Sequence, residues 1–243
     1  MFAKRGRIDR WLSRHYQVPR REIRGWLVRG RIQVDGIVVK DPETQVDEFN
    51  QIACDGVMVQ HHQRQYWMLH KPVGVVSATR DLKHPTVIDL LDCPNKDQLH
   101  IAGRLDLNSS GLLLLTNDSR WSKGMTLPEN KVSKRYQVGL QNPLVPEMVA
   151  AFANGMYFEY EDHTTLPAQL EIVGTYTAAV TLQEGKYHQI KRMFGRFRNP
   201  VVSIHRVAIG AISLDPALQP GQSRQLTAEE VQSVRSEDCV APR

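Results

Sequence analysis

The sequence is poor in cysteine and has no long apolar run. Its three cysteines, Cys54, Cys93 and Cys239, lie far apart and form no C-x-x-C pair, which argues against a disulfide framework and against a cysteine-based zinc site. No apolar stretch approaches the length that spans a bilayer, and no signal-peptide segment follows the charged N-terminus. We therefore expect a soluble protein of a reducing cytoplasm that does not contact membranes.

Sequence motifs for nucleotide and hydrolase chemistry are also missing. The chain has no G-x-x-x-x-G-K-[ST] phosphate loop, no G-x-G-x-x-G after a predicted strand and no G-x-S-x-G elbow. The adjacent His61 and His62 have no His or Cys partner at a spacing that would hold a metal ion. Dinucleotide redox chemistry and nucleotide hydrolysis therefore have no support, and we expect neither a metal nor another cofactor.

Positive charge is concentrated at the N-terminus. Residues 1–31 contain ten Lys or Arg and two acids, a net charge of +8, whereas the remaining chain has 21 basic and 24 acidic residues, a net charge of −3. A basic segment favours a polyanionic partner, because each neutralised phosphate releases counterions. A solvated basic face without a specific partner is the alternative.

Residues 7–29 have the pattern of two short amphipathic helices joined around Val18-Pro19. Trp11 and Trp26 recur at helical spacing with aliphatic residues, so we expect their rings in a core rather than stacked on bases. Arg20, Arg21 and Arg24 then share a helix surface away from the core. The first part of the chain is therefore predicted to be a small helical unit with a basic surface.

The segment RIQVDGIVV follows as two alternating strands around Asp35-Gly36, which is a strong signal for a two-residue hairpin. This helix-helix-hairpin unit resembles the alpha-L RNA-binding module found in a small-subunit ribosomal protein and in many RNA-modifying enzymes. The resemblance implies that residues 1–55 form the module. It also implies that the following arginines bind RNA: Arg7, Arg20, Arg21, Arg24 and Arg29.

Residues 56–65 are predicted to be a linker, and residues 66–243 a larger domain. From residue 66 onward, apolar and alternating segments predict strands, including a hairpin over residues 166–185 and a basic helix over YHQIKRMFGRF. HPTVIDLL is predicted to be a short helix that begins near Thr86. These elements predict an α+β fold, in which the small module is followed by a mixed, mostly antiparallel sheet.

The stretch HIAGRLDLNSSGLLLLTND, residues 100–118, contains the main candidate for a reactive residue. Asp106 lies two residues after Arg104, in a polar turn that leads into the apolar run 112–115, which is typical of a buried strand. A turn that joins a buried strand can hold a carboxylate rigidly at a cleft. An aspartate in a turn is more often structural, so this pattern alone leaves the role of Asp106 open.

The remaining polar residues favour chemistry on RNA. Tyr136 adds an aromatic ring on a predicted strand, and the segment 186–206 contains six Lys or Arg and no acid. A carboxylate can attack the anomeric carbon of a ribose, or stabilise charge there, while an aromatic ring stacks on a base that has left the helix. A neighbouring cation favours the ionised form of the carboxylate. We therefore expect the second domain to act on a nucleoside inside RNA.

Four blocks in order, GRLD, GLLLLTND, KRY and EGKYHQIKRMF, resemble the family of RNA pseudouridine synthases that modify ribosomal RNA and carry an alpha-L module in front. The resemblance covers almost the whole chain and is closest to the members that act on small-subunit (16S) rRNA. It implies a catalytic domain of pseudouridine synthase type, which flips one uridine out of the RNA and isomerises it to pseudouridine without a cofactor. The implied partner is rRNA in a partly assembled small subunit, and nothing demands more than a monomer.

The resemblance also implies roles for residues around the cleft. Asp106 is the essential acid, Arg104 helps to hold the flipped nucleotide and Tyr136 packs on the target base. In isolation, Tyr136 would fit equally well as a core residue of a strand. Whether the acid forms a covalent adduct or acts as a base at the sugar stays open.

Four further residues are implied to bind the nucleotide or the RNA around it. Lys191 takes the basic position that pairs with the acid, with Arg192 beside it. Leu182 is the apolar residue of the pocket, and Lys186 contacts RNA. Many relatives have arginine at the two lysine positions, and lysine keeps the charge but loses a bidentate contact. As a lone residue, Lys191 would equally fit a solvated helix charge.

Two other functions compete with this prediction. One is a large-subunit rRNA pseudouridine synthase, because those enzymes have similar motifs. The other is an rRNA-binding assembly factor without catalysis. The joint presence of Asp106, Tyr136 and Lys191 argues against a pure binding protein, because a carboxylate aimed at RNA repels phosphate.

Overall fold

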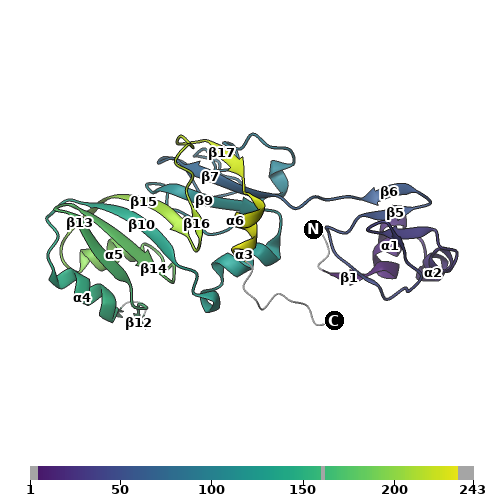
Figure 1. The fold of residues 1–243 in the computed structure, drawn as a ribbon, viewed down its shortest axis with the longest axis horizontal. Helices are drawn as coiled ribbons and strands as arrows, with labels where there is room; N and C mark the ends of the chain where they lie inside the picture. The colour runs from purple at the N-terminus through teal and green to yellow at the C-terminus, as the bar shows by residue number, and fades with distance from the viewer. Residues whose placement is uncertain (1–4, 160–161, 235–243) are drawn as a thin grey trace. The chain divides into compact units, whose positions relative to one another are not determined.

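The computed structural model describes residues 5–159 and 162–234, so Cys239 lies outside the described residues. The chain divides into two compact units between Arg64 and Gln65. Figure 1 shows the course of the chain through both units. No helix in the described ranges is both long enough and apolar enough to cross a membrane. Each unit is described by itself below.

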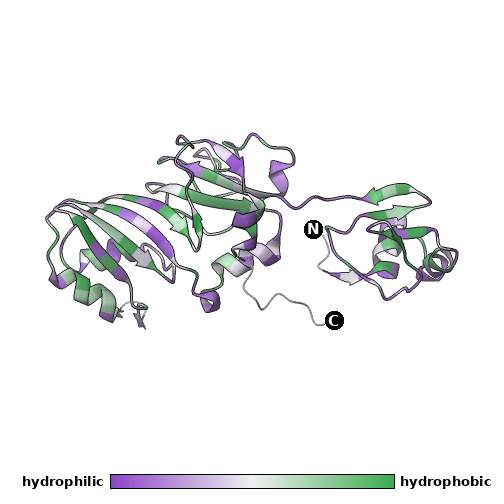
Figure 2. Cartoon of the chain, in the orientation of Figure 1, coloured by the Kyte–Doolittle hydropathy of each residue, from purple (hydrophilic) through white to green (hydrophobic). Residues whose placement is uncertain are grey.

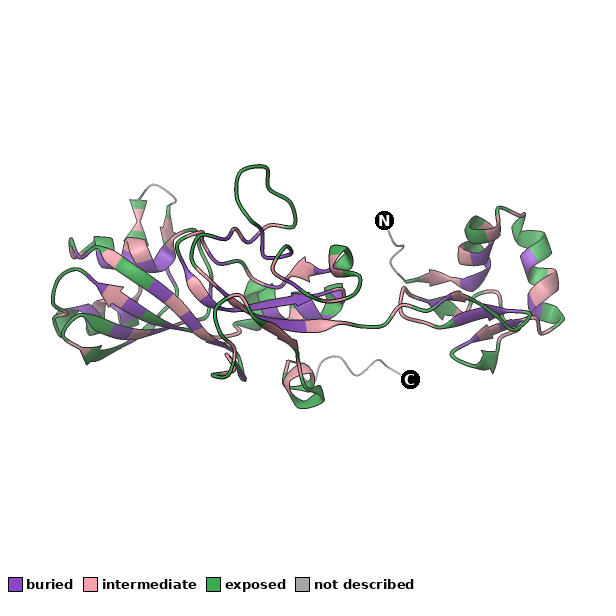
Figure 3. Ribbon diagram, turned by 90° about the horizontal axis from the view of Figure 1, so that it is seen from above, coloured by how far each residue is buried: buried purple, intermediate pink, exposed green. Residues whose placement is uncertain are grey.

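Two short helices form one side of the first unit, as predicted. They are α1 (Ile8–Tyr16) and α2 (Arg20–Val28), and Gln17, which caps the C-terminus of α1, has the left-handed conformation. Buried residues lie on one face of each helix and exposed residues on the other (Figure 3). Trp11 and Trp26 pack against the apolar core, which confirms their predicted place.

The strands of the first unit form hairpins at Asp-Gly turns. A four-stranded sheet runs in the order β3 (Ile37–Val38), β2 (Ile32–Val34), β5 (Ile52–Cys54), β6 (Val57–Gln60). Asp35 and Gly36 have φ of 51° and 79°, the left-handed values of the predicted turn. A second pair of short strands joins β1 (Gly6–Arg7) to β4 (Gln45–Val46).

The predicted linker over residues 56–65 is wrong for residues 57–60. These residues form β6, which pairs with β5 and closes the sheet of the first unit. The physical reason is a second tight turn: Asp55 and Gly56 have φ of 50° and 79°, nearly the values of the first turn. The edge strand also buries Gln60, whose amide donates to the carbonyl oxygens of Asp47 and Asn50.

The second unit is built on a mixed sheet whose main path runs β13-β14-β10-β15-β9-β7-β17 (Figure 1). Among the described strands, β9 and β15 form the parallel pair and their other pairings are antiparallel. The mixed, mostly antiparallel prediction is therefore confirmed. The strands of the path are β7 (Tyr66–Lys71), β9 (Ser110–Thr116), β10 (Lys134–Leu140), β13 (Gln169–Gly174), β14 (Thr177–Leu182), β15 (Val201–Ile209) and β17 (Ser223–Gln225).

Four short strands complete the second unit. β8 (His100–Ile101) pairs with β9, and β16 (Ile212–Ser213) pairs with β15. A separate two-stranded ribbon joins β11 (Tyr157–Phe158) to β12 (His163–Thr164). Two 3-10 turns, Lys96–Gln98 and Pro128–Asn130, lie in the connections.

Strand β9 is buried on both faces, which explains its run of four leucines. Leu113 and Leu115 join a core that includes residues of α4 (Glu147–Asn154) and α5 (Gln189–Gly195). Leu112 and Leu114 join a second core with residues of α3 (Ser119–Thr126). Figure 2 shows the hydrophobic character of the strands in the sheet. The loop that ends at Ser109, directly before this strand, is therefore anchored to a buried strand.

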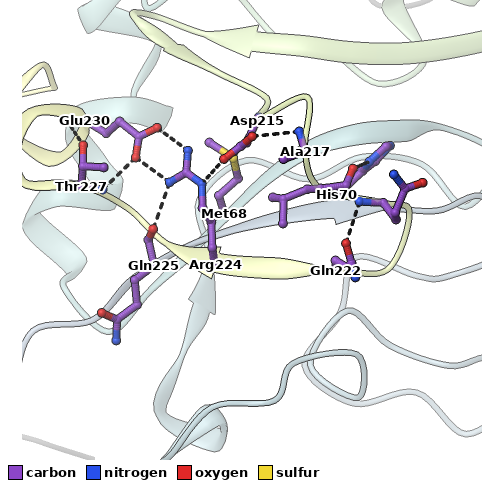
Figure 4. Close-up of polar contacts among 11 residues, drawn as sticks. Met68, His70, Asp215, Ala217, Gln222, Arg224, Gln225, Thr227 and Glu230 are labelled. Atoms are coloured by element: carbon purple, nitrogen blue, oxygen red, sulfur yellow. Dashed lines mark hydrogen bonds and ion pairs between the residues drawn. The ribbon is translucent and has the colours of Figure 1, made fainter.

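The C-terminal part of the described chain covers the free edge of β7. Strand β17 pairs antiparallel with β7, and His70 N donates to the carbonyl oxygen of Gln222 (Figure 4). Arg224 bridges Asp215 and Glu230. Glu230 also completes a capping box with Thr227 at the start of α6 (Ala228–Gln232). These contacts hold β17 at the edge of the sheet, next to β7.

The helix predicted over HPTVIDLL is wrong. Thr86 makes an isolated bridge to Val76, and residues 87–90 form turns. The side chain of Asp89 accepts hydrogen bonds from the backbone N–H and the hydroxyl of Thr86. The backbone here makes hydrogen bonds between residues three apart, from Asp89 N to Thr86 O and from Leu91 N to Ile88 O, instead of the four-residue bonds of an α-helix.

Candidate active site

Asp106 lies in a tight loop between β8 and β9, as the sequence predicts. The loop begins near Gly103, with φ of 91°, and closes with a hydrogen bond from Ser109 N to the carbonyl oxygen of Asp106. The hydroxyl of Ser77 donates to the carbonyl oxygen of Leu105 and accepts from its N–H. The backbone on both sides of the carboxylate is therefore held by specific partners.

A buried lysine holds one side of this loop. Lys71, at the end of β7, is fully buried, and its ammonium donates to the carbonyl oxygens of Ser109 at 2.7 Å and Pro72 at 2.9 Å. A longer contact of 3.5 Å reaches the carbonyl oxygen of Leu107. Burial lowers the pKa of Lys71 to about 8, although the negative charge of Asp106 opposes the shift. The lysine therefore links β7 to the loop through the backbone.

A buried arginine holds the other side. Arg206 on β15 donates to the carbonyl oxygens of Gly103, Arg104 and Leu112, at 2.9, 3.2 and 2.8 Å. Gly111 makes this contact possible, because a Cβ atom there would lie 2.3 Å from the backbone oxygen of Arg206. The close parallel pairing of β9 and β15 thus places the arginine under the loop.

The carboxylate of Asp106 faces two basic side chains from the segment before and within α5. Its Oδ2 lies 3.6 Å from Nζ of Lys191 and 3.3 Å from Nε2 of His188. All three side chains are about one-third exposed. Such a site is open to a substrate, and Lys191 places a positive charge beside the carboxylate. The structure thus brings Lys191 to the predicted acid.

Asp106 borders a cavity of about 390 Å³ in the second unit, which lies in the size range of small-molecule sites. Tyr136 from β10 and Leu182 from β14 contribute its buried walls. The two neighbouring strands thereby place an aromatic ring and an aliphatic side chain at the same cleft as the acid. The cavity is lined by Arg104, Leu105, Asp106, Ser109, Tyr136, Leu182, Gly185, Lys186, Tyr187, His188, Gln189, Ile190 and Ile204.

Arg192 is placed elsewhere. Its guanidinium stacks over the ring of Phe158 at 4.1 Å and borders a neighbouring cavity rather than the one around Asp106. The reason is the direction of side chains on α5, where adjacent residues point about 100° apart. Lys186 borders both cavities. Of the residues predicted beside the acid, Arg192 is thus the one that the structure separates from it.

Sequence reasoning missed Lys71, His188 and Tyr187. Lys71 carries a recognisable signal, because it is a basic residue at the end of the apolar strand segment YWML. His188 lies three residues before Lys191 in the same block, but its backbone φ of 50° belongs to no regular element. That conformation brings its ring to the carboxylate, and residue spacing does not reveal it. Among the described residues, no group of three or more His, Cys, Asp or Glu is placed to hold a metal ion.

The arginines predicted to bind RNA in the first unit have different surroundings. Arg7 binds the buried carboxylate of Asp9 through Nε and Nη2 and reaches Glu43 through Nη1. Arg24, which is more exposed, lies 3.6 Å from the same Asp9. Arg7 is therefore a structural residue of this unit rather than a freely exposed basic one. Arg21 and Arg29 are exposed.

A basic hollow in the first unit includes two arginines that sequence reasoning missed. Arg10, Ser13 and Arg14 from α1 and the predicted Arg20 from α2 border a depression of about 270 Å³. Positions 10 and 14 are four residues apart and thus share one helix face. The exposed basic surface therefore includes α1 as well as α2.

Comparison with known proteins agrees with this arrangement. Residues 65–195 match the RNA pseudouridylate synthase family, and residues 6–52 match the S4 domain. The chain is 48% identical to ribosomal small subunit pseudouridine synthase A of Pseudomonas aeruginosa, over 94% of this chain and 100% of that protein. The protein of the same name from Escherichia coli K12 is 41% identical, over 94% and 99%.

A solved structure of a pseudouridylate synthase has a TM-score of 0.70 and 35% identity to this protein, over 94% of this chain and 99% of that one. The predicted family and fold class are confirmed by these matches. The chain belongs to the RNA pseudouridylate synthase family, and it is an RNA pseudouridine synthase with an S4 domain in front of its catalytic domain.

Proposed function

We propose that this protein isomerises one uridine of small-subunit (16S) rRNA to pseudouridine, with Asp106 as the catalytic residue. The observation that carries the proposal is the placement of Asp106 at the mouth of a cavity, with Lys191 at 3.6 Å and with Tyr136 and Leu182 in the walls. Small-subunit rRNA is proposed because the relatives from P. aeruginosa and E. coli are named for that subunit.

The reaction breaks the bond between N1 of uracil and C1′ of ribose, turns the base, and joins C5 to C1′, after which C5 loses its proton and N1 gains one. Asp106 either attacks C1′ or removes a proton from the sugar, and both routes need its ionised form. Lys191 supplies positive charge next to that carboxylate, and Nε2 of His188 lies 3.3 Å from it. The loop backbone is already held by buried cations, so little reorganisation accompanies the reaction.

The target uridine must leave the RNA helix to reach this cavity, which costs a few kcal/mol of stacking and pairing. Tyr136 packs on the flipped base, Leu182 contacts it from the neighbouring strand, and Arg104 holds its phosphate or sugar at the rim. Tyr136 is only 8% exposed and belongs to the main core. This burial fixes the ring before the RNA arrives and lowers the entropic cost of stacking.

The S4 domain supplies positioning through phosphate contacts, and we extend the proposal to a partly assembled small subunit as substrate and to a monomeric enzyme. The test is tritium release from rRNA labelled at C5 of its uracils, with small-subunit RNA, large-subunit RNA and small-subunit assembly particles in parallel. Release from small-subunit substrates alone is expected. Release from large-subunit RNA alone would make this a large-subunit enzyme, and tight binding without release from any substrate would favour a non-catalytic assembly factor.

A further inference from the structure

A second cavity of about 330 Å³ adjoins the one around Asp106. Both are bordered by the same short segment, which contributes Lys186, Tyr187 and Gln189 to each. The other residues around the second cavity come from α5 and from the segment around the β11–β12 ribbon. They are Phe158, Asp162, His163, Thr165 and Arg192.

Tyr187 stands out on this shared border. Its side chain is 77% exposed, more than that of any other aromatic residue in the described ranges. The ring nevertheless has a defined position, because it stacks on His188 at 3.9 Å between centroids and 23° between planes. His188 in turn lies 3.3 Å from the carboxylate of Asp106. An aromatic ring that is open to solvent on one face and supported on the other is a platform for a further flat group.

The backbone that carries this ring is held from below. The buried side chain of Gln189 accepts a hydrogen bond from Lys186 N at 3.1 Å and donates to Glu184 at 2.6 Å. Glu184 also accepts from Leu166 N. Lys186 and Tyr187 are thus fixed in place although both side chains are exposed, which reduces the entropy lost when they bind a partner.

Charge and chemistry identify the partner class. Lys186 is exposed, and Arg192 adds a second cation whose guanidinium stacks on Phe158. The one acid among the lining residues given above, Asp162, accepts a hydrogen bond from the hydroxyl of Tyr157. Exposed aromatic rings next to cations are the usual way to bind single-stranded nucleic acid, because bases stack on the ring while the cations meet the backbone.

We propose that Tyr187 is the stacking platform for the base of a nucleotide that directly flanks the target uridine. The second cavity receives this nucleotide, and Lys186 contacts the phosphate between the two. The inference rests on the proposed function in one respect, since the target uridine occupies the cavity around Asp106. A flipped uridine leaves its neighbour without a stacking partner, and Tyr187 replaces that partner.

The test is a double-mutant cycle between protein and RNA. The RNA is an rRNA fragment that contains the target uridine. The base of its 5′ or its 3′ neighbour is removed to leave an abasic residue. Affinity is measured by fluorescence anisotropy for the wild type, Tyr187→Ala and Tyr187→Phe. Loss of one stacked base weakens binding by roughly tenfold, and this loss is expected for the wild type and Tyr187→Phe at one of the two neighbours.

Tyr187→Ala is expected to lose affinity for the intact fragment and to show no further loss at that abasic site. Tyr176→Ala serves as a matched control, because this tyrosine is also exposed, at 51%, but borders neither cavity. The inference would be overturned if, at both neighbours, removal of the base weakened RNA binding by Tyr187→Ala as much as by the wild type. Tritium release from the intact fragment is measured in parallel. If tritium is released but the losses of affinity from Tyr187→Ala and from base removal simply add, the stacking platform is overturned and the proposed reaction stands. If the two losses do not add and no tritium is released, the platform is supported and the proposed reaction is overturned.

Discussion

Replacing Lys71 by methionine tests whether this residue positions Asp106, because its effect on the stability of the catalytic domain and its effect on activity are measured separately. The substitution removes two short hydrogen bonds, to Ser109 at 2.7 Å and to Pro72 at 2.9 Å. Hydrogen bonds from a charged donor contribute about 1.5–3 kcal/mol each, so their joint loss costs about 3–6 kcal/mol. The longer contact to Leu107 adds little at 3.5 Å.

An opposing effect limits this loss. Burial lowers the pKa of Lys71 from 10.5 to about 8, and at 1.36 kcal/mol per unit this shift corresponds to about 3 kcal/mol against the buried charge. Methionine has no charge to bury and recovers that amount. The net change is therefore a destabilisation of about 0–3 kcal/mol, or several degrees in Tm for a domain of this size.

Activity is expected to fall much further than stability. Without Lys71 the loop loses its link to β7, and a shift of about 1 Å in a reacting group costs about 100-fold in rate. Urea unfolding followed by single-turnover tritium release measures both effects on one preparation, with the exposed Lys123→Met as control. Wild-type turnover in Lys71→Met would refute the claim that this lysine positions Asp106, and so would a rate loss fully explained by the unfolded fraction.

Three further predictions concern the rest of the chain. Gly111→Ala is expected to destabilise the catalytic domain by about 3 kcal/mol, because the added Cβ overlaps the backbone of β15 and alanine is strained at φ of 108°. A thermal unfolding temperature within about 2 °C of the wild type would contradict this prediction. Burial alone raises the pKa of Asp9, but the hydrogen bonds and charge of Arg7 outweigh burial and hold it below its usual value. Its contribution to the S4 domain is therefore present above about pH 4 and lost as the pH falls through the lower, folded pKa. The protection of amides in residues 8–28 against hydrogen exchange, relative to the unfolded chain, should fall there, and in Arg7→Met it should already be low at neutral pH. Replacing Arg10, Arg14 and Arg20 together by alanine should reduce the slope of log affinity for rRNA against log salt concentration by about two to three. An unchanged slope would show that this surface does not bind RNA.

Periodicity and turn chemistry predict much of the fold because they are local. The run 112–115 predicts a buried strand, and β9 is indeed buried, with one face in each of two cores. Asp35-Gly36 predicts its hairpin, and the same dipeptide at Asp55-Gly56 marks the hairpin that the linker prediction missed. The helix predicted near Thr86 fails because the segment closes turns with hydrogen bonds between residues three apart, and the spacing of apolar residues does not distinguish such turns from an α-helix.

The candidate site is predicted only in part, because its geometry depends on contacts between distant segments. Asp106, Tyr136 and Leu182 lie on regular strands or in a tight turn next to one, so family motifs are enough to bring them together. Lys71 and Arg206 act through backbone carbonyl groups, and side-chain patterns do not reveal which carbonyl groups they bind. Their roles follow from the pairing of β7 and β15 with β9, a property of the assembled sheet.

The most direct test of the account is the turnover of Asp106→Asn on small-subunit rRNA labelled with tritium at C5 of its uracils. The amide has nearly the shape of the carboxylate but neither attacks C1′ nor accepts a proton as a base. We predict no tritium release by Asp106→Asn and RNA affinity within a few fold of the wild type. Release is expected to be unchanged for Asp97→Asn, an exposed aspartate that does not border the cavity. Tritium release by Asp106→Asn at the wild-type rate would contradict the account, because the loop, its two buried cations and the facing lysine would then hold a residue that the reaction does not use.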